Sequence, residues 1–139
     1  AGNYEGIATL EEVISWKCKI SQVTDLNPGD SVGYGLTFTA EKSMKYATLP
    51  VGYADGLSRA LSGGKGAVYI AGHRCAILGR VCMDMCMVDV SGLEVHPGDE
   101  VEILGPHQSA SDLAMAAGTI SYEILTGIGP RVPRLYIKD

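Results

Sequence analysis

Apolar and polar residues alternate along much of this chain, which is typical of β-strands that bury one face. The longest alternation covers residues 13–23 (VISWKCKISQV) and predicts one long strand. Two Pro-Gly-Asp sequences, at 28–30 and 97–99, predict turns, because proline presets φ and glycine supplies a positive one. The other strands that the alternation predicts cover residues 45–51, 67–70, 74–77, 80–90 and 100–104.

Helical patterning is confined to a stretch near the C-terminus. Ser109 or Ser111 is a suitable N-cap, and Gly118 is a suitable end for the helix that follows. The residues predicted to line one face of this helix are Leu113, Ala116 and Ala117. A second short helix is predicted over Tyr122–Thr126, after Ser121.

The chain closes on a predicted edge strand over residues 132–137, because Pro133 cannot donate a hydrogen bond inside a sheet. We therefore predict a mainly β fold. It is a small, barrel-like antiparallel β domain with one or two short helices near its C-terminus. The expected boundaries are a linker or N-terminal extension over residues 1–12 and the domain over residues 13–139.

Composition narrows the class of protein. The chain has 139 residues, 46% hydrophobic and 19% charged, with a net charge of −5 and no basic run. These values predict a single globular domain and argue against nucleic-acid binding. No apolar stretch reaches about 18 residues, so this segment is not expected to enter a membrane, and its first residues do not resemble a signal peptide.

The four cysteines predict neither a disulfide nor a metal site. Cys82 and Cys86 are predicted to share one strand face with their Cα atoms about 13 Å apart, too far to bridge. The three histidines show no spacing suited to a metal ion. We expect reduced thiols packed as small hydrophobes, which indicates a cytoplasmic location.

The residue best placed for chemistry is Tyr34, which lies between Gly33 and Gly35. Glycine on both sides leaves the phenol uncrowded and permits backbone angles that a Cβ forbids. A phenol presented in this way can transfer a proton to or from a ligand. The local pattern by itself favours a strand bulge with an ordinary half-buried aromatic.

Two further segments depart from the requirements of a plain β-barrel. In Val51-Gly52-Tyr53-Ala54-Asp55-Gly56, Tyr53 is either a ligand contact or an aromatic that covers a turn. In residues 79–90, alternation places Asp84 on the apolar cysteine face. A buried carboxylate needs donors such as Arg80 or backbone N–H groups. It serves either structural pairing or the ordering of a ligand-binding loop.

Four segments together resemble the C-terminal β domain of bacterial alanine racemases. They occur in the family's order and are VGYGLTFTA (32–40), PVGYADG (50–56), GRVCMD (79–84) and RVPR (131–134). The resemblance extends from about Val13 to Ile137. It implies a pyridoxal-phosphate-dependent homodimer that interconverts L- and D-alanine for cell-wall synthesis.

By this resemblance, Tyr34 matches the tyrosine base that acts from the opposite subunit on the L-enantiomer face. Met83 matches a residue whose backbone N–H holds the substrate carboxylate, and Tyr53 matches a tyrosine at the active-site entrance. Asp84 follows that methionine and is expected to orient it. The resemblance also implies that pyridoxal phosphate is held by an N-terminal α/β barrel, so no cofactor-binding residue is assigned here.

One position departs from the family pattern. Many relatives have a tyrosine immediately before the RVPR segment, and this chain has Pro130. Proline has neither a hydroxyl nor an N–H, so no phosphate contact is expected there. Membrane-bound serine racemases of the vancomycin-resistance type share this domain, which leaves serine open as the substrate. A non-catalytic interaction module also remains open.

Overall fold

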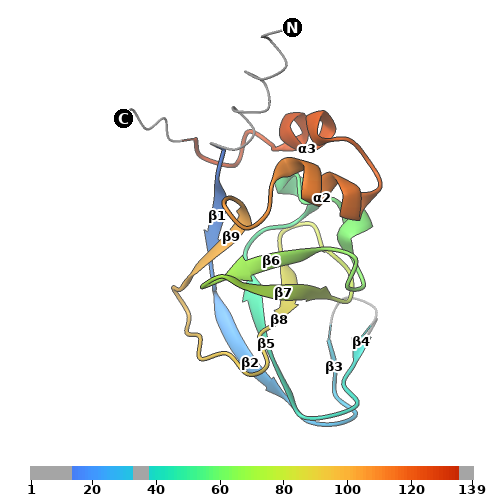
Figure 1. Cartoon of the computed structure of the whole chain (residues 1–139). Coiled ribbons are helices and arrows are strands. Elements are labelled where there is room, and N and C mark those ends of the chain that lie inside the picture. Colours follow the sequence, from blue (N-terminus) through green and yellow to red (C-terminus); the bar gives the residue numbers. More distant parts are fainter. Residues whose placement is uncertain (1–13, 33–37, 135–139) are drawn as a thin grey trace, which may run out of the picture.

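A seven-stranded antiparallel sheet forms the body of the domain (Figure 1). The computed structural model describes residues 14–32 and 38–134. The sheet has the strand order β1-β9-β6-β7-β8-β5-β2. Its strands are β1 (Trp16–Lys19), β2 (Gln22–Leu26), β5 (Met44–Leu49), β6 (Ala67–Ile70), β7 (His73–Leu78), β8 (Cys86–Asp89) and β9 (Glu100–Leu104). The strands β3 (Ser31–Val32) and β4 (Phe38–Thr39) form a separate pair.

The sheet curls because the chain crosses directly from one of its ends to the other. The single strand predicted over residues 13–23 is in fact two strands, β1 and β2, separated only by Ile20 and Ser21. The Ile20 N–H donates to the Asp99 carbonyl at 3.0 Å, whereas the next N–H donates to Thr48 at 2.9 Å. Adjacent amides thus bond to opposite ends of the sheet, which gives the predicted barrel-like shape.

The predicted strand over residues 80–90 is also corrected. Only Cys86–Asp89 is a strand, and residues 80–85 form a loop. The Cys82 N–H donates to the Met85 carbonyl at 2.9 Å and closes a tight turn. Cys82 and Asp84 therefore do not lie on a strand face with Cys86. Residues 132–134 are not part of a strand either, and the rest of that predicted edge strand lies outside the described residues.

The strands predicted over 67–70 and 100–104 are confirmed with the same bounds. β6 and β7 form a hairpin whose turn residues, Ala71 and Gly72, have φ values of 49° and 80°. Positive φ at both positions matches the right-handed twist of the flanking strands. Strands β5 and β7 lie within one or two residues of their predicted bounds.

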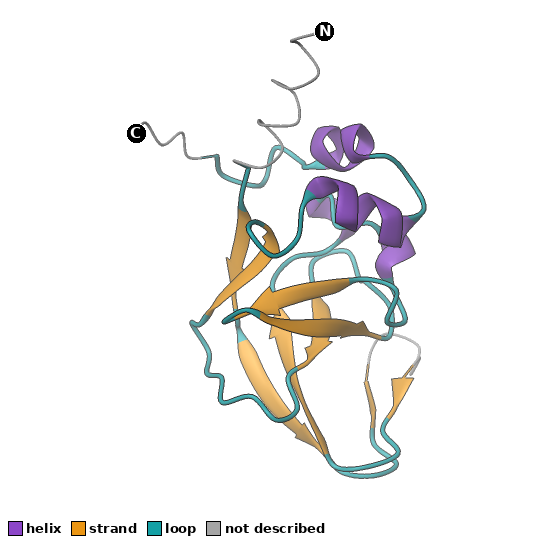
Figure 2. Ribbon diagram, in the orientation of Figure 1, coloured by secondary structure: helices purple, strands orange, loops and turns teal. Residues whose placement is uncertain are grey.

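Two α-helices gather at one end of the sheet (Figure 2). They are α2 (Ala110–Ala117) and α3 (Ser121–Gly127), as predicted near the C-terminus. Ser109 is the N-cap of α2. Its hydroxyl accepts a hydrogen bond from the Asp112 N–H, and the Asp112 carboxylate accepts one from the Ser109 N–H, which forms a capping box. Gly118 ends the helix with a left-handed φ of 75°. Two single-turn 3₁₀ helices, Tyr53–Asp55 and Arg59–Leu61, follow β5.

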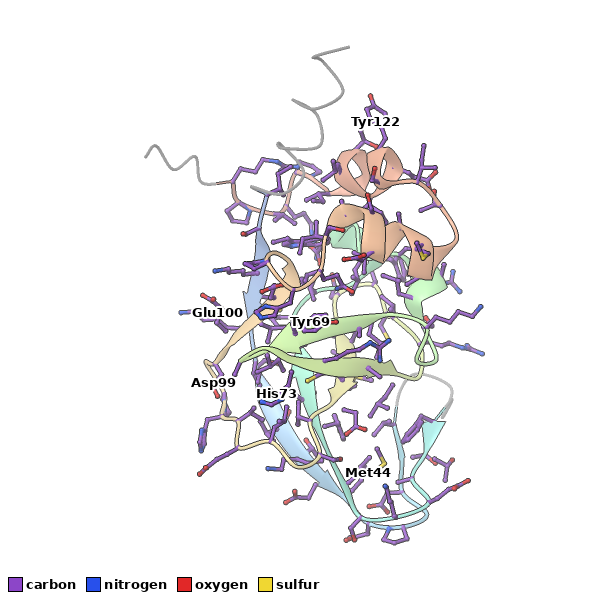
Figure 3. All side chains as sticks on the ribbon, viewed as in Figure 1. Met44, Tyr69, His73, Asp99, Glu100 and Tyr122 are labelled. Carbon is purple, nitrogen blue, oxygen red and sulfur yellow. The ribbon has the colours of Figure 1, made fainter. Side chains whose placement is uncertain are left out.

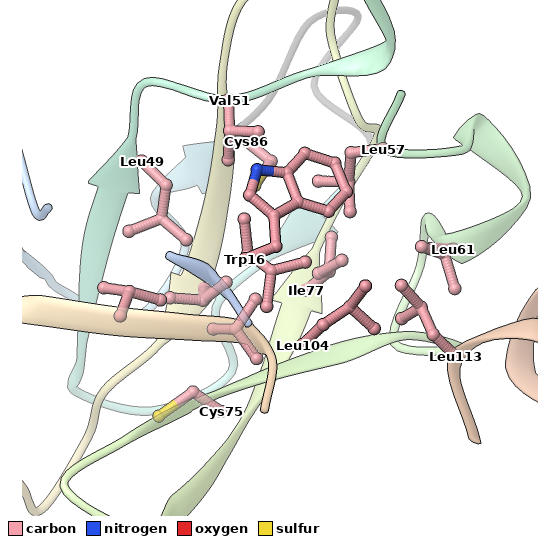
Figure 4. Packing of buried hydrophobic residues seen from close by; sticks show 14 of the residues in the cluster. Trp16, Leu49, Val51, Leu57, Leu61, Cys75, Ile77, Cys86, Leu104 and Leu113 are labelled. Atoms are coloured by element: carbon pink, nitrogen blue, oxygen red, sulfur yellow. The ribbon is translucent and has the colours of Figure 1, made fainter. Parts of the chain in front are cut away.

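One apolar core fills the space between the curled sheet and the helices. Trp16 is its largest side chain and lies beside Val51, Leu57 and Cys86 (Figure 4). Residues from every strand of the large sheet except β2 contribute buried side chains to this core. The connection after β5 is anchored by this core through Val51 and Leu57, which fixes the base of the candidate site.

Candidate functional site

Two loops that are distant in sequence lie against each other beside the sheet. The Tyr53 N–H donates to the Cys82 carbonyl, and the Ala54 N–H donates to the Met83 carbonyl, each at 3.0 Å. A Cβ on Gly52 would lie 2.2 Å from the Cys82 oxygen and 2.4 Å from the Met83 oxygen. Glycine is therefore required at this position by close contact between the two backbones.

Asp55 closes the first of these loops and is one of two buried polar residues in the described part of the chain. Its carboxylate Oδ2 accepts a hydrogen bond from the Gly52 N–H at 3.0 Å. Its own N–H donates to the Gly52 carbonyl at 3.0 Å. The turn that carries Tyr53 is thus closed by two hydrogen bonds between Gly52 and Asp55, one to the Asp55 side chain and one from its backbone.

Arg131 joins the two loops through their carboxylates. Its Nε donates to Asp55 Oδ1 at 3.0 Å, and its Nη2 donates to Asp84 Oδ1 at 2.8 Å. Nη2 also lies 3.0 Å from Asp55 Oδ1. The hydrogen bonds to Asp84 and then to Asp55 raise the pKa of Arg131 above its ordinary value. The guanidinium therefore stays charged and bridges both loops.

The segment that carries Arg131 is itself fastened to the first loop. The Gly129 N–H donates to the Asp55 carbonyl at 3.0 Å. The Arg134 guanidinium donates to the carbonyls of Ile128, Gly129 and Val132 at 2.8–3.2 Å. Three stretches of chain, 52–56, 80–85 and 128–134, thus form one hydrogen-bonded unit.

The orientation of the Met83 N–H follows from these contacts. The Cys82–Met83 peptide is trans, so its C=O and N–H point in opposite directions. Because the Cys82 carbonyl accepts from Tyr53, the Met83 N–H points away from the first loop. Among the residues that the structure describes, no acceptor contacts this N–H. The arrangement can therefore offer a hydrogen-bond donor to an anion.

A groove of about 530 Å³ lies beside the second loop. Its lining is mainly apolar, and Met83 and Met85 are 50% and 45% exposed. The lining residues are Gln22, Tyr46, Thr48, Cys82, Met83, Asp84, Met85 and Met87. The groove thus combines apolar walls with the Asp84 carboxylate, which suits a small polar ligand or a packed partner surface.

Three of the four predicted site residues lie within the described structure, and the fourth does not. Met83, Asp84 and Tyr53 lie on the two interlocked loops. Tyr53 is 45% exposed, and the Arg59 guanidinium carbon lies 5.7 Å from the centre of its ring. Tyr34 lies outside the described residues, between β3 and β4 in the sequence.

The partner proposed for Asp84 was wrong. Sequence reasoning suggested Arg80 or backbone N–H groups, whereas the donor is Arg131, 47 residues away. The second carboxylate that Arg131 contacts, Asp55, is not among the predicted site residues. The sequence carries no local signal for this contact, because Arg131 is 76 and 47 residues away from its two partners.

The cysteines differ in burial and acidity. Cys75 and Cys86 are buried, and Cys18 and Cys82 are partly exposed. Burial raises the pKa of Cys18 to about 12. Burial, and then the charge of Asp89, raises the pKa of Cys75 to about 11. Within residues 14–32 and 38–134, no group of three His, Cys, Asp or Glu side chains is placed to hold a metal ion.

A model of the family described as "Alanine racemase, C-terminal domain" matches residues 13–136 of the chain. The chain belongs to this family. It is 48% identical over 135 residues to the alanine racemase of Clostridium perfringens strain SM101, covering 94% of the chain and 35% of that protein. It is 46% identical over 132 residues to the alanine racemase of Halothermothrix orenii, covering 91% of the chain and 35% of the relative.

Solved structures of alanine racemases share the fold of this C-terminal domain. The biosynthetic alanine racemase of Pseudomonas aeruginosa superposes with a TM-score of 0.87 at 39% identity, over 94% of the chain and 37% of the relative. The Bartonella henselae enzyme, solved with covalently bound pyridoxal phosphate, gives 0.85 at 38% identity over 88% and 34%. The chain thus spans about a third of the length of these relatives. In the described residues, no helix is long and apolar enough to cross a membrane.

Proposed function

We propose that this domain is the C-terminal part of a cytoplasmic, pyridoxal-phosphate-dependent racemase that interconverts L- and D-alanine for peptidoglycan synthesis. The observation that carries the proposal is the match to full-length alanine racemases at 46–48% identity. The chain covers 35% of each of these proteins, and we assign the remaining parts of the site to another domain. Its partners are then an N-terminal α/β barrel and the second subunit of a homodimer.

Pyridoxal phosphate does not fit the groove of this chain by itself. None of the residues that line the groove is a lysine or an arginine, so the groove supplies neither the covalent anchor nor a phosphate partner. This agrees with a cofactor held by the N-terminal barrel. When bound there, pyridoxal phosphate withdraws electrons from the substrate and allows the α-proton to leave.

Inversion at the α-carbon requires acid–base groups on both faces of the substrate. We assign the phenol oxygen of Tyr34 to the L-enantiomer face, where it takes or returns the α-proton. Its ordinary pKa is about 10, so a nearby cation or donor is needed for it to act as a base. The partner barrel is the expected source of that group.

The two interlocked loops then bind and orient the substrate. The Met83 N–H is aimed away from the first loop, where it can donate to the substrate carboxylate. Asp84, held by Arg131, keeps the Met83 peptide in place. Tyr53, which is 45% exposed, is assigned to the entrance through which the amino acid reaches the site.

The direct test is a Tyr34→Phe substitution in the full-length protein. The change removes one hydroxyl and should lower kcat for L-alanine by at least about a hundredfold, as general acid–base groups commonly contribute. Tyr122→Phe is the matched control, because Tyr122 is 71% exposed and projects from α3 away from the sheet (Figure 3). Unaltered racemisation by the Tyr34 variant would show that Tyr34 is not the acid–base group.

Serine is the second candidate substrate, and Pro130 is the observation that favours it. Pro130 is exposed and lies next to Arg131, at the position where many relatives have a tyrosine that narrows the channel. Comparing turnover of L-alanine and L-serine by the full-length protein separates the two substrates. If neither amino acid is turned over, the domain is an interaction module of the same fold.

A further inference from the structure

Arg131 is the only residue in the described part of the chain that forms ion pairs with two different carboxylates. We propose that Arg131 is a positioning residue, which sets the direction of the Met83 N–H by tying Asp84 to Asp55. This inference rests on the proposed function, because it gives that N–H a substrate carboxylate to bind. Arg131 does not line the groove and is not assigned a substrate contact.

The first step of the inference concerns rigidity. Asp55 is buried, with 7% of its surface exposed, and its second oxygen is taken by the Gly52 N–H. Its side chain therefore has one position. Arg131 donates to Asp55 through Nε and to Asp84 through Nη2, two nitrogens in the same rigid plane. The position of Asp55 thereby fixes that of Asp84.

The second step concerns how the loop that carries Asp84 is held without the Arg131–Asp84 contact. The Asp84 side chain is 54% exposed, and Arg131 is its hydrogen-bond partner among the described residues. The second loop is otherwise held to the first by the carbonyls of Cys82 and Met83 alone. The base of the loop is also anchored, because Val81 and Cys86 are buried and the Val81 N–H donates to Ser62 Oγ at 2.8 Å. Its tip, residues 82–85, can still rotate about the line that joins the two hydrogen bonds. The Arg131–Asp84 contact adds a third point and stops that rotation.

The third step connects rotation to the donor. The Met83 N–H lies on the far side of the peptide from the Cys82 carbonyl, so it moves when the loop rotates. Such a displacement lengthens or misaligns the hydrogen bond to the substrate carboxylate and therefore weakens substrate binding. Arginine suits this role better than lysine, because a lysine ammonium keeps the charge but has no rigid fork to hold two carboxylates in one plane.

The test uses the full-length protein with Arg131→Gln, Arg131→Lys and Asp84→Asn. We expect Arg131→Gln to raise KM for L-alanine by about tenfold while kcat stays within about twofold, since a lost binding contact changes KM alone. Arg131→Lys should recover part of the loss. The double variant Arg131→Gln/Asp84→Asn should be no worse than Arg131→Gln, because both changes remove the same contact.

Amide hydrogen exchange provides a readout that does not depend on activity. Arg131→Gln should speed exchange in peptides that cover residues 52–55 and 80–85 and leave the remaining strands of the sheet unchanged. Lys17→Gln is the control, because the Lys17–Glu100 pair is also exposed, at 3.1 Å, and lies on β1 and β9 away from the groove. It should change neither exchange in these peptides nor KM.

Each outcome is decisive. Faster exchange in the two loops together with the rise in KM supports the inference. Unchanged exchange and KM overturn it, and so does faster exchange across the whole domain with unchanged KM, since that describes a purely structural ion pair. If the wild-type protein racemises no amino acid, the proposed function fails, while the exchange comparison still decides whether Arg131 holds the two loops.

Discussion

Replacing Gly52 by alanine tests the contact between the two loops. The φ of Gly52 is −149°, which any residue adopts, so the substitution introduces no backbone strain. Its effect comes from the added Cβ, which would meet the Cys82 oxygen at 2.2 Å and the Met83 carbonyl carbon at 2.6 Å. Both are backbone atoms, so no side chain can rotate away.

The size of the effect follows from these distances. An acceptable contact begins near 3.0–3.4 Å, so the loops must separate by about 1 Å, which breaks the two hydrogen bonds between them. Overpacking costs about 1–3 kcal/mol, and each lost hydrogen bond costs about 1 kcal/mol. The expected loss in the free energy of unfolding is therefore about 3–5 kcal/mol.

Urea unfolding of the 139-residue chain measures this loss. For a typical dependence on urea of about 2 kcal/mol per molar, the midpoint should fall by about 2 M. Gly127→Ala is the matched control, because a Cβ there meets no atom within 4 Å. Its effect should stay within about 1 kcal/mol. Equal midpoints for Gly52→Ala, Gly127→Ala and the wild type would refute the close approach of the loops.

Two further predictions concern pH. Burial raises the pKa of Cys18 from 9.0 to about 12, so the unfolded chain loses this proton first and stability should fall between about pH 9 and pH 12. Urea unfolding at pH 8 and pH 10 measures this fall in the free energy of unfolding, which should be smaller in Cys18→Ala than in the wild type. An equal fall in both proteins would contradict the assignment. Burial acts to raise the pKa of Glu102, but hydrogen bonds from the His107 side chain and backbone outweigh it and lower the pKa. The resulting stability is present above about pH 4.5, the ordinary pKa of this carboxyl, and is lost as the pH falls through the lower folded pKa. Glu102→Gln should therefore show a smaller loss of stability between pH 6 and pH 3, and an unchanged loss would argue against the contact.

Local pattern was sufficient for much of the fold. The bounds of β6 and β9 follow from alternation between turn residues. The start and end of α2 follow from Ser109 and Gly118, whose preferences depend on neighbouring backbone alone. These features depend on contacts within a few residues, and such contacts are visible in the sequence.

Pattern failed where distant segments override it. Residues 13–23 alternate without interruption, yet the strand divides at Ile20–Ser21 because the two halves pair with opposite ends of the sheet. Apolar and polar residues also alternate over 80–85, yet the backbone of this segment forms hydrogen bonds with Tyr53 and Ala54 and within the segment itself. In both places, the competing hydrogen-bond partners come from elements that alternation cannot identify.

The sequence by itself determined the class of fold, the helix ends and, through four short segments in order, the family. Only the tertiary structure decided which carboxylates Arg131 pairs with, at separations of 76 and 47 residues. It also decided the direction of the Met83 N–H. The physical reason is that a peptide's orientation depends on the partner of its carbonyl, and here that partner is brought close only when the sheet curls.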